Sequence, residues 1–264
     1  MTNTVERNGQ TGAVPPTKYH RFRKDTMLAA PPVPIPLSLP IGGSDERFFL
    51  RRVYCVGRNY ADHAREMGND PDREPPFFFS KPTDAVFAVA EGVPSRAIAP
   101  HEVPYPPQTA NLHFEMELIV AIGREGADIP AADALGHVWG YGAGIDLTRR
   151  DLQDEAKAMK RPWDLSKGFD FSGPCSPLVP AEAIGHPARG GIWLSVDGDT
   201  RQLADLNDQI WAVNDVVAAL SRSVTLMPGD VIFTGTPAGV GAIERGDRVA
   251  GGIAGVGELT FTLV

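Results

Sequence analysis

The chain has 264 residues, 42% of them apolar, and a formal net charge of -8. This length and composition fit a globular protein with one main domain and one sizeable core. The 28 Gly and 24 Pro residues favour strands and turns over a helical bundle, so we expect a mixed β fold with few short helices. The acidic balance argues against nucleic acid or an anionic membrane as a partner, because such surfaces are bound by clustered Lys and Arg.

The two cysteines, Cys55 and Cys175, have no paired spacing and no neighbouring His cluster. They therefore indicate neither a disulfide framework nor a thiolate zinc site, and a reducing cytoplasm is the expected compartment. The sequence has no apolar run of about 18 residues and no signal-peptide pattern, so we expect no membrane span.

Two parts of the chain differ in amino-acid composition and pattern. Residues 1–45 are predicted to be an N-terminal tail and appendage, polar and disordered to about residue 25 and then extended where prolines alternate with apolar residues. Residues 46–264 are predicted to form the main domain. Its first elements are a strand at Arg51–Val56, a short helix at Asn59–Met67, a loop at Gly68–Pro76 and, up to Pro107, short strands without a helix.

The segment His113–Ile122 predicts a strand with two different faces, because alternate side chains of a strand share a face. Glu115 and Glu117 stand side by side on one face, which Ile119 and Ala121 continue. The other face is apolar throughout and consists of Phe114, Met116, Leu118, Val120 and Ile122.

The rest of the chain predicts alternating strands and short helices. A Gly-rich strand at Val138–Leu147 carries Asp146 near its end, and a helix is expected to open at Thr148. The further predictions are strands at Ile192–Val196, Val231–Thr234, Arg248–Gly252 and Leu259–Leu263, and a helix at Ala212–Ser221.

The pair Glu115 and Glu117 on an apolar strand predicts a cation site. Two such carboxylates repel each other and lose solvation unless a cation compensates them. Magnesium suits a set of carboxylate oxygens, and Asp146 is the natural third ligand. A solvated strand face is the alternative for an isolated Glu-x-Glu pair.

Two pairs with helical spacing are candidates for chemistry. His63 and Glu66 are three residues apart, so they can hold a water jointly, with His63 as base and Glu66 as its orienter. Arg150 and Gln153 show the same spacing beside Asp146, as a carboxylate substrate would require. Spacing alone also fits plain surface helices in both cases.

Lone lysines usually lie in solvent, so the pattern by itself assigns no role to Lys81 or Lys167. The glycines of the run from Thr234 to Gly241 would let backbone N–H groups approach an anion, although a tight structural turn explains the run equally well.

Together these residues resemble the fumarylacetoacetate hydrolase superfamily, and the resemblance covers roughly Phe48 to Val264. The matching segments stand in the family's order: Gly57-Arg58-Asn59-Tyr60 with His63 and Glu66, Phe79-Ser80-Lys81-Pro82, Glu115-Met116-Glu117, Gly144-Ile145-Asp146-Leu147-Thr148 with Arg150-Asp151 and Gln153, Lys167-Gly168-Phe169-Asp170, and Thr234-Gly235-Thr236-Pro237.

The resemblance implies a fold, a cofactor and a set of roles. It implies a β-roll or sandwich-like catalytic domain over residues 46–264, a homodimer, and Mg²⁺ or Mn²⁺ held by Glu115, Glu117 and Asp146. It also implies catalysis by His63, Glu66 and Lys167. The substrate-binding residues that it implies are Arg58, Lys81, Arg150, Gln153 and Thr236.

Within the superfamily, the segments around Arg52–Met67, Arg149–Gln153 and Arg161–Asp164 look most like bacterial fumarylpyruvate hydrolases of gentisate breakdown. The implied activity is cleavage of the C–C bond of an acylpyruvate, a small oxo-acid, here fumarylpyruvate to fumarate and pyruvate. The alternatives are decarboxylation of oxaloacetate or a related β-keto acid on the same scaffold, and metal-dependent binding of dicarboxylates without catalysis.

Overall fold

The computed structural model describes residues 37–66, 68 and 75–264. Most of the predicted tail, and most of the loop predicted at Gly68–Pro76, lie outside the described residues. Within the unit that ends at Val264, the appendage contributes one short strand, Ser38–Pro40, which pairs with Arg47–Phe49 and in which Leu39 is fully buried. The boundary predicted at residue 45 stays a prediction.

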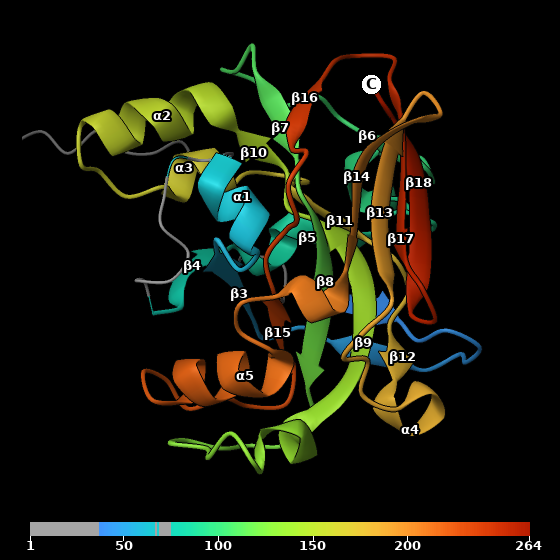
Figure 1. Ribbon diagram of the computed structural model, residues 1–264. Coiled ribbons are helices and arrows are strands. Elements are labelled where there is room, and N and C mark those ends of the chain that lie inside the picture. Colours follow the sequence, from blue (N-terminus) through green and yellow to red (C-terminus); the bar gives the residue numbers. More distant parts are fainter. Residues whose placement is uncertain (1–36, 67, 69–74) are drawn as a thin grey trace, which may run out of the picture. The chain divides into compact units, whose positions relative to one another are not determined.

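The described chain is mostly β-structure, which confirms the predicted fold class (Figure 1). The largest sheet contains, in spatial order, β4 (Phe77–Lys81), β3 (Arg52–Gly57), β15 (Asp230–Phe233), β8 (Met116–Ile122), β9 (Val138–Ile145), β11 (Gly173–Cys175) and β5 (Val86–Ala88), with β12 (Val179–Pro180) also paired to β9. A second sheet contains β14 (Asp199–Asp205), β13 (Gly191–Val196), β17 (Arg248–Ile253), β18 (Gly257–Leu263) and β6 (Glu102–Val103).

Smaller elements complete the fold. Two small sheets are formed by β10 (Thr148–Arg149), β7 (Leu112–Phe114) and β16 (Gly241–Ile243), and by β1 (Ser38–Pro40) and β2 (Arg47–Phe49). The helices are α1 (Ala61–Glu66), α2 (Arg150–Ala158), α3 (Asp164–Lys167), α4 (Ala181–Ile184) and α5 (Val213–Ser221). The 3-10 turns among the described residues are η2 (Thr83–Ala85), η3 (Pro94–Arg96), η4 (Ala134–His137) and η5 (Leu206–Asp208).

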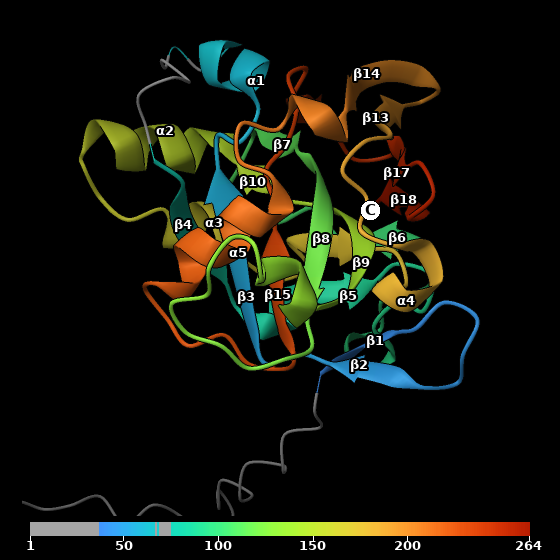
Figure 2. The same cartoon turned by 60° about the horizontal axis from the view of Figure 1, so that its bottom comes forward.

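Strand β8 is buried on both faces, in the central position that Figure 2 shows between β15 and β9. The predicted apolar face, with Met116 and Leu118, belongs to the main core between the two large sheets, and Ile119 and Ala121 belong to a second core on the other side. The predicted division of this strand into two faces is therefore confirmed, and both faces are interior.

The predicted strand His113–Ile122 is broken at Glu115, which is a correction to the sequence analysis. Residues before the break pair with β10 and β16, whereas residues after it pair with β15 and β9. The chain therefore changes sheets at Glu115. The helix expected to open at Thr148 begins instead at Arg150, because Thr148 and Arg149 form a strand that pairs with β7.

Helices α2 and α3 lie together beside β10 and β4, at the end of the large sheet where β8 begins (Figure 1). Helix α1 follows β3 directly and lies near this end too. Among the described residues, no helix has the length and apolarity needed to cross a membrane. The elements that carry the candidate site residues are thus gathered at one end of the large sheet.

Gly140 on β9 provides a test of this packing. A Cβ atom there would lie 2.4 Å from the carbonyl oxygen of Val179 on the paired strand β12. Because backbone cannot move aside easily, Gly140→Ala is expected to lower the free energy of unfolding by about 1–3 kcal/mol, measured by urea denaturation. Gly136→Ala, where the added atom meets nothing within 4 Å, is the control and should change it by less than about 0.5 kcal/mol. Equal stability of the two variants would contradict the close pairing of β9 with β12.

Candidate metal centre and active site

The register of β8 and β9 brings three carboxylates together. The strands are antiparallel, with Met116 opposite Ile145 and Glu117 opposite Gly144, and the Asp146 N–H donates to the Glu115 carbonyl at 2.8 Å. Residues opposite each other in a sheet share a face. Glu115, Glu117 and Asp146 therefore converge, with ligand oxygens all within 4.8 Å of one another, and all three are buried.

Three buried cationic groups surround these carboxylates, each from a different element. Lys167 Nζ donates to Glu115 Oε2 and Asp146 Oδ2, both at 2.8 Å, and to the hydroxyl of Thr148 at 2.7 Å. Arg150 Nη2 lies 2.5 Å from Glu115 Oε1, and Lys81 Nζ lies 2.7 Å from Asp146 Oδ1. The two lysines are each only 3% exposed, so the usual expectation of solvated lysines does not hold here.

The carboxylates differ in how well they are compensated. Burial raises the pKa of Glu115, but the charges of Lys167 and Arg150 outweigh it and hold that pKa well below its usual range. The pKa of Glu117 is raised by burial and by the negative charges of Asp146 and Glu115. The charge of Lys167 and the hydrogen bond that Oε2 accepts from the Gly235 N–H at 2.7 Å oppose this shift only in part. Glu117 is therefore less well compensated than Glu115.

The donor set fits a hard divalent cation such as Mg²⁺ or Mn²⁺, whose preferred ligands are carboxylate oxygens. A cation among these oxygens would add positive charge beside Glu117, whose pKa is raised by burial and by the two neighbouring carboxylates. Asp146 Oδ1 is buried and accepts no hydrogen bond, although the Lys81 ammonium lies 2.7 Å away. This oxygen therefore retains a lone pair for a cation. The three predicted ligands thus form a buried group that is able to hold such a cation.

The predicted pair on α1 forms a hydrogen-bonded dyad. His63 is 5% exposed, and its Nδ1 lies 3.4 Å from Glu66 Oε2, which also accepts from the Gly239 N–H at 3.2 Å. Burial lowers the pKa of His63, against the opposing effects of Glu115 and Glu66. The imidazole is therefore neutral near pH 7, as a general base must be.

The turn after β15 is held in place by two buried amides that the sequence analysis did not find. Gln202 on β14 donates to the Thr236 hydroxyl at 2.9 Å and to the Pro237 carbonyl at 2.8 Å, and accepts from the Met116 N–H at 3.0 Å. Asn59 donates to the Thr234 carbonyl at 2.8 Å. No sequence pattern marks Gln202, since β14 is otherwise largely exposed.

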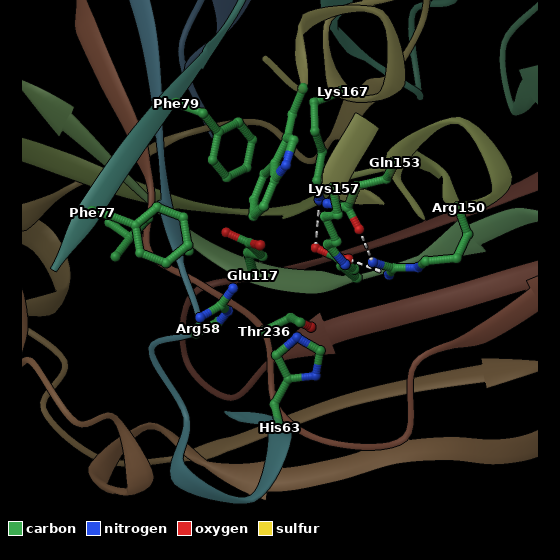
Figure 3. A pocket seen from close by; sticks show the side chains of 14 residues that line it. Arg58, His63, Phe77, Phe79, Glu117, Arg150, Gln153, Lys157, Lys167 and Thr236 are labelled. Carbon is green, nitrogen blue, oxygen red and sulfur yellow. Dashed lines mark hydrogen bonds and ion pairs between the residues drawn. The ribbon is translucent and has the colours of Figure 1, made fainter. Parts of the chain in front are cut away.

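One pocket collects most of the predicted residues (Figure 3). It is lined by Arg58, His63, Glu115, Glu117, Arg150, Gln153, Lys167 and Thr236 among others. Of the remaining three, Lys81 and Asp146 are buried and do not line the pocket, and Glu66 is hydrogen-bonded to His63. Arg58 has a φ of 56°, a left-handed conformation that is uncommon outside glycine and is often found at ligand sites.

The pocket also contains side chains to which the sequence analysis gave no role: Val56, Phe77, Phe79, Lys157 and Trp163. Trp163 makes edge contacts with Phe77 and Phe79, at centroid distances of 5.7 and 6.0 Å. A signal for Lys157 was present, because it follows Arg150 and Gln153 at helical spacing on α2. The aromatic wall could not be inferred, since β4 and α3 are far apart in the sequence.

Asp146→Asn tests the cation site. The change removes one of three negative charges and leaves Lys81 and Lys167 facing a neutral amide, so Mn²⁺ affinity measured by calorimetry should fall at least about tenfold. Glu125→Gln, which removes an exposed charge, is the control and should bind Mn²⁺ like the unmodified protein. A folded Asp146→Asn protein, verified by its thermal melt, with unchanged affinity would rule out Asp146 as a ligand.

Comparison with known proteins agrees with this geometry. One similar solved structure is the crystal structure of fumarylpyruvate hydrolase from Pseudomonas aeruginosa in complex with Mn²⁺ and pyruvate, with a TM-score of 0.82. The two sequences are 55% identical, and the match covers 87% of this chain and 96% of that chain. It is 39% identical over 213 residues to the mitochondrial oxaloacetate tautomerase FAHD1 of Homo sapiens, covering 80% of this chain and 90% of that protein. The chain is also 39% identical, over 215 residues, to the mitochondrial oxaloacetate decarboxylase of Dictyostelium discoideum. That match covers 81% of this chain and 94% of the decarboxylase.

The family model described as fumarylacetoacetate (FAA) hydrolase C-terminal matches residues 52–264, which include every candidate site residue named above. The predicted family is therefore confirmed: this chain belongs to the fumarylacetoacetate hydrolase family of enzymes.

Proposed function

We propose that this protein is a divalent-metal-dependent acylpyruvase that hydrolyses fumarylpyruvate to fumarate and pyruvate. The observation that carries the proposal is that two of the three carboxylates, Glu115 and Glu117, face one pocket together with a neutral, buried histidine, His63. A cation site alone would suit a binding protein, but a base beside it suits activation of water. The identity of 55% to a fumarylpyruvate hydrolase supports this choice of substrate.

The His63 and Glu66 pair supplies the attacking water. His63 takes a proton from water while Glu66 orients the ring, and the hydroxide forms a bond to the acyl carbonyl carbon at position 4. When the adduct collapses, the bond between carbons 3 and 4 breaks and its electron pair becomes the enolate of pyruvate. The proton held by His63 then goes to carbon 3, and the released acid loses its own proton to solvent.

The other pocket residues bind and orient the substrate. A divalent cation held by Glu115, Glu117 and Asp146 would stabilise negative charge on the 2-oxo oxygen and carboxylate of the substrate. Arg150 and Gln153, already hydrogen-bonded to each other at 2.6 Å, present N–H donors for the carboxylate, and Thr236 presents a hydroxyl. These contacts hold the acyl carbonyl within reach of His63.

The two lysines receive different roles in this proposal. All three N–H donors of the Lys167 ammonium are occupied, so it stabilises developing oxyanion charge only by giving up one of these bonds. Lys81 is buried behind the pocket, where it contacts Asp146 and the Ser172 hydroxyl at 3.0 Å. We therefore assign Lys81 to positioning Asp146, in place of the direct substrate contact predicted from the resemblance.

A second candidate is conversion of oxaloacetate, by decarboxylation or keto–enol tautomerisation. Its specific support is the identity of 39% to an oxaloacetate tautomerase and an oxaloacetate decarboxylase. Decarboxylation requires no attacking water, so it would tolerate loss of His63. The homodimer, the cytoplasmic compartment and the gentisate pathway stay predictions.

Turnover distinguishes these candidates. Fumarylpyruvate is expected to lose its ultraviolet absorbance and release fumarate and pyruvate in the presence of Mg²⁺ or Mn²⁺, and to stop doing so in EDTA. His63→Ala should retain Mn²⁺ binding and lose at least about 100-fold in kcat, the usual contribution of a general base. Metal-dependent release of carbon dioxide or tautomerisation of oxaloacetate, without turnover of fumarylpyruvate, would replace the proposal with the second candidate. Metal and dicarboxylate binding without either activity would indicate a binding protein.

The pH profile tests the dyad. Because burial lowers the pKa of His63, kcat/KM should fall only below pH 6.5, where the imidazole gains a proton and ceases to be a base. Glu66 raises this pKa, so Glu66→Gln should move the acid limb to still lower pH and reduce the plateau. Asp62→Asn on the exposed side of α1 is the control and should leave the limb in place. A limb that moves to higher pH in Glu66→Gln would contradict the assignment of His63.

A further inference from the structure

One face of α2 carries a row of polar side chains that runs away from the cation site. Arg150, Gln153 and Lys157 are spaced by three and four residues, so they lie on the same side of the helix. Arg150 contacts Glu115, Gln153 accepts from Arg150, and all three residues line the pocket. Lys157 is therefore the last member, in chain order, of a row whose first member touches a proposed metal ligand.

Lys157 is an unusual surface lysine. Its side chain is 32% exposed, and its ammonium lies 5.6 Å from the centroid of the Trp163 ring. Burial lowers its pKa, and so do the positive charges of Arg150 and Arg58, while the charge of Asp154 opposes them. Four cationic side chains line the pocket, and of these Arg150 and Lys167 contact Glu115, whereas Arg58 and Lys157 lie outside the carboxylate group, an arrangement that favours a bound anion there.

The wall of the pocket between the charged groups is aromatic. Phe77 and Phe79 of β4 lie on one side of the pocket, and Arg150 and Gln153 lie on the other (Figure 3). The edge contacts of both Phe rings with Trp163 make this wall continuous. A flat, apolar carbon chain with a charged group at each end would match it.

The dimensions agree with such a ligand. Seven residues of helix separate the Arg150 and Lys157 backbones by roughly 10 Å, and helical side chains lean back toward the N-terminus, which brings the ammonium closer to the cation site. A seven-carbon chain spans roughly 7 Å, since three backbone bonds cover about 3.6 Å. Lys157 is therefore within reach of the far end of a substrate whose near end lies beside Arg150.

We propose that Lys157, together with Arg58, binds a second carboxylate at the far end of the acyl group and thereby determines substrate specificity. The inference rests on the proposed function, and it narrows the substrate class to acylpyruvates whose short, flat acyl chain ends in a carboxylate. Phe77, Phe79 and Trp163 flank the chain between the two charged ends. Arg150 and Gln153 bind the near carboxylate, so residues of one helix contact both ends of the substrate.

The ordinary alternative is a surface lysine that pairs with Asp154, whose carboxylate lies 3.5 Å away. That pair is largely exposed and would contribute little to any step. It predicts that removal of the Lys157 charge affects substrates with and without a distal carboxylate alike.

The experiment compares two substrates that differ only at the far end: fumarylpyruvate and crotonylpyruvate, in which a methyl group replaces the distal carboxylate. With Mn²⁺ bound, Lys157→Met should lower kcat/KM for fumarylpyruvate about tenfold, mainly through KM, and change that for crotonylpyruvate less than about twofold. Lys160→Met, which removes an exposed charge just beyond α2, is the matched control and should alter neither value. Lys157→Arg should restore most of the preference.

A loss of equal size on both substrates, or no loss on either, would overturn the role of Lys157. If the unmodified enzyme hydrolyses neither substrate, the proposed function fails, and binding tests Lys157 separately. Calorimetric titration with fumarate or crotonate, at saturating Mn²⁺ and pyruvate, should then show about tenfold weaker fumarate binding in Lys157→Met and unchanged crotonate binding. Unchanged fumarate binding would reject the assignment.

Discussion

The mutual compensation of six buried charged groups is the constraint on which the site depends. Glu115, Glu117 and Asp146 come from the junction of β7 with β8, from β8 and from the end of β9, whereas Lys81, Arg150 and Lys167 come from β4, α2 and α3. Removing one partner of a buried ion pair typically lowers the free energy of unfolding by roughly 3–5 kcal/mol, because the other charge stays buried without a compensating charge. The contacts of Arg150 and the two lysines therefore hold β4, α2 and α3 against the start of β8.

The same charges explain why the pocket suits an anionic oxo acid. Counted as ionised, the six groups sum to zero, so a divalent cation would give the site a surplus of two positive charges. The carboxylate and enolate oxygens of a 2-oxo acid carry two negative charges together. Hydrolysis of an acylpyruvate, decarboxylation of oxaloacetate and its tautomerisation all require such an enolate, so under each of the proposed activities this half of the site would stabilise the same species.

The sequence predicted the parts of the site that local periodicity controls. Alternation along residues 116–122 separated Glu117 from the apolar face, and helical spacing paired His63 with Glu66 and Arg150 with Gln153. It did not predict the break at Glu115, which depends on which strands pair with either side. Nor did it predict the burial of Lys81 and Lys167, because two lysines from separate elements become interior only where carboxylates from a third element meet them.

What sets this pocket apart from a general enolate site is the opposite half, built from β4, α3 and the outer end of α2. These elements supply aromatic rings and Lys157, and none of these side chains contacts the carboxylates. Changes there can therefore alter which acyl group fits without disturbing the charge balance around Asp146. In the proposed function, selection of the acyl chain and stabilisation of the enolate would thus fall to separate walls of one pocket. Helix α2, with Arg150 and Lys157, and strand β4, with Lys81 and the two Phe rings, contribute to both.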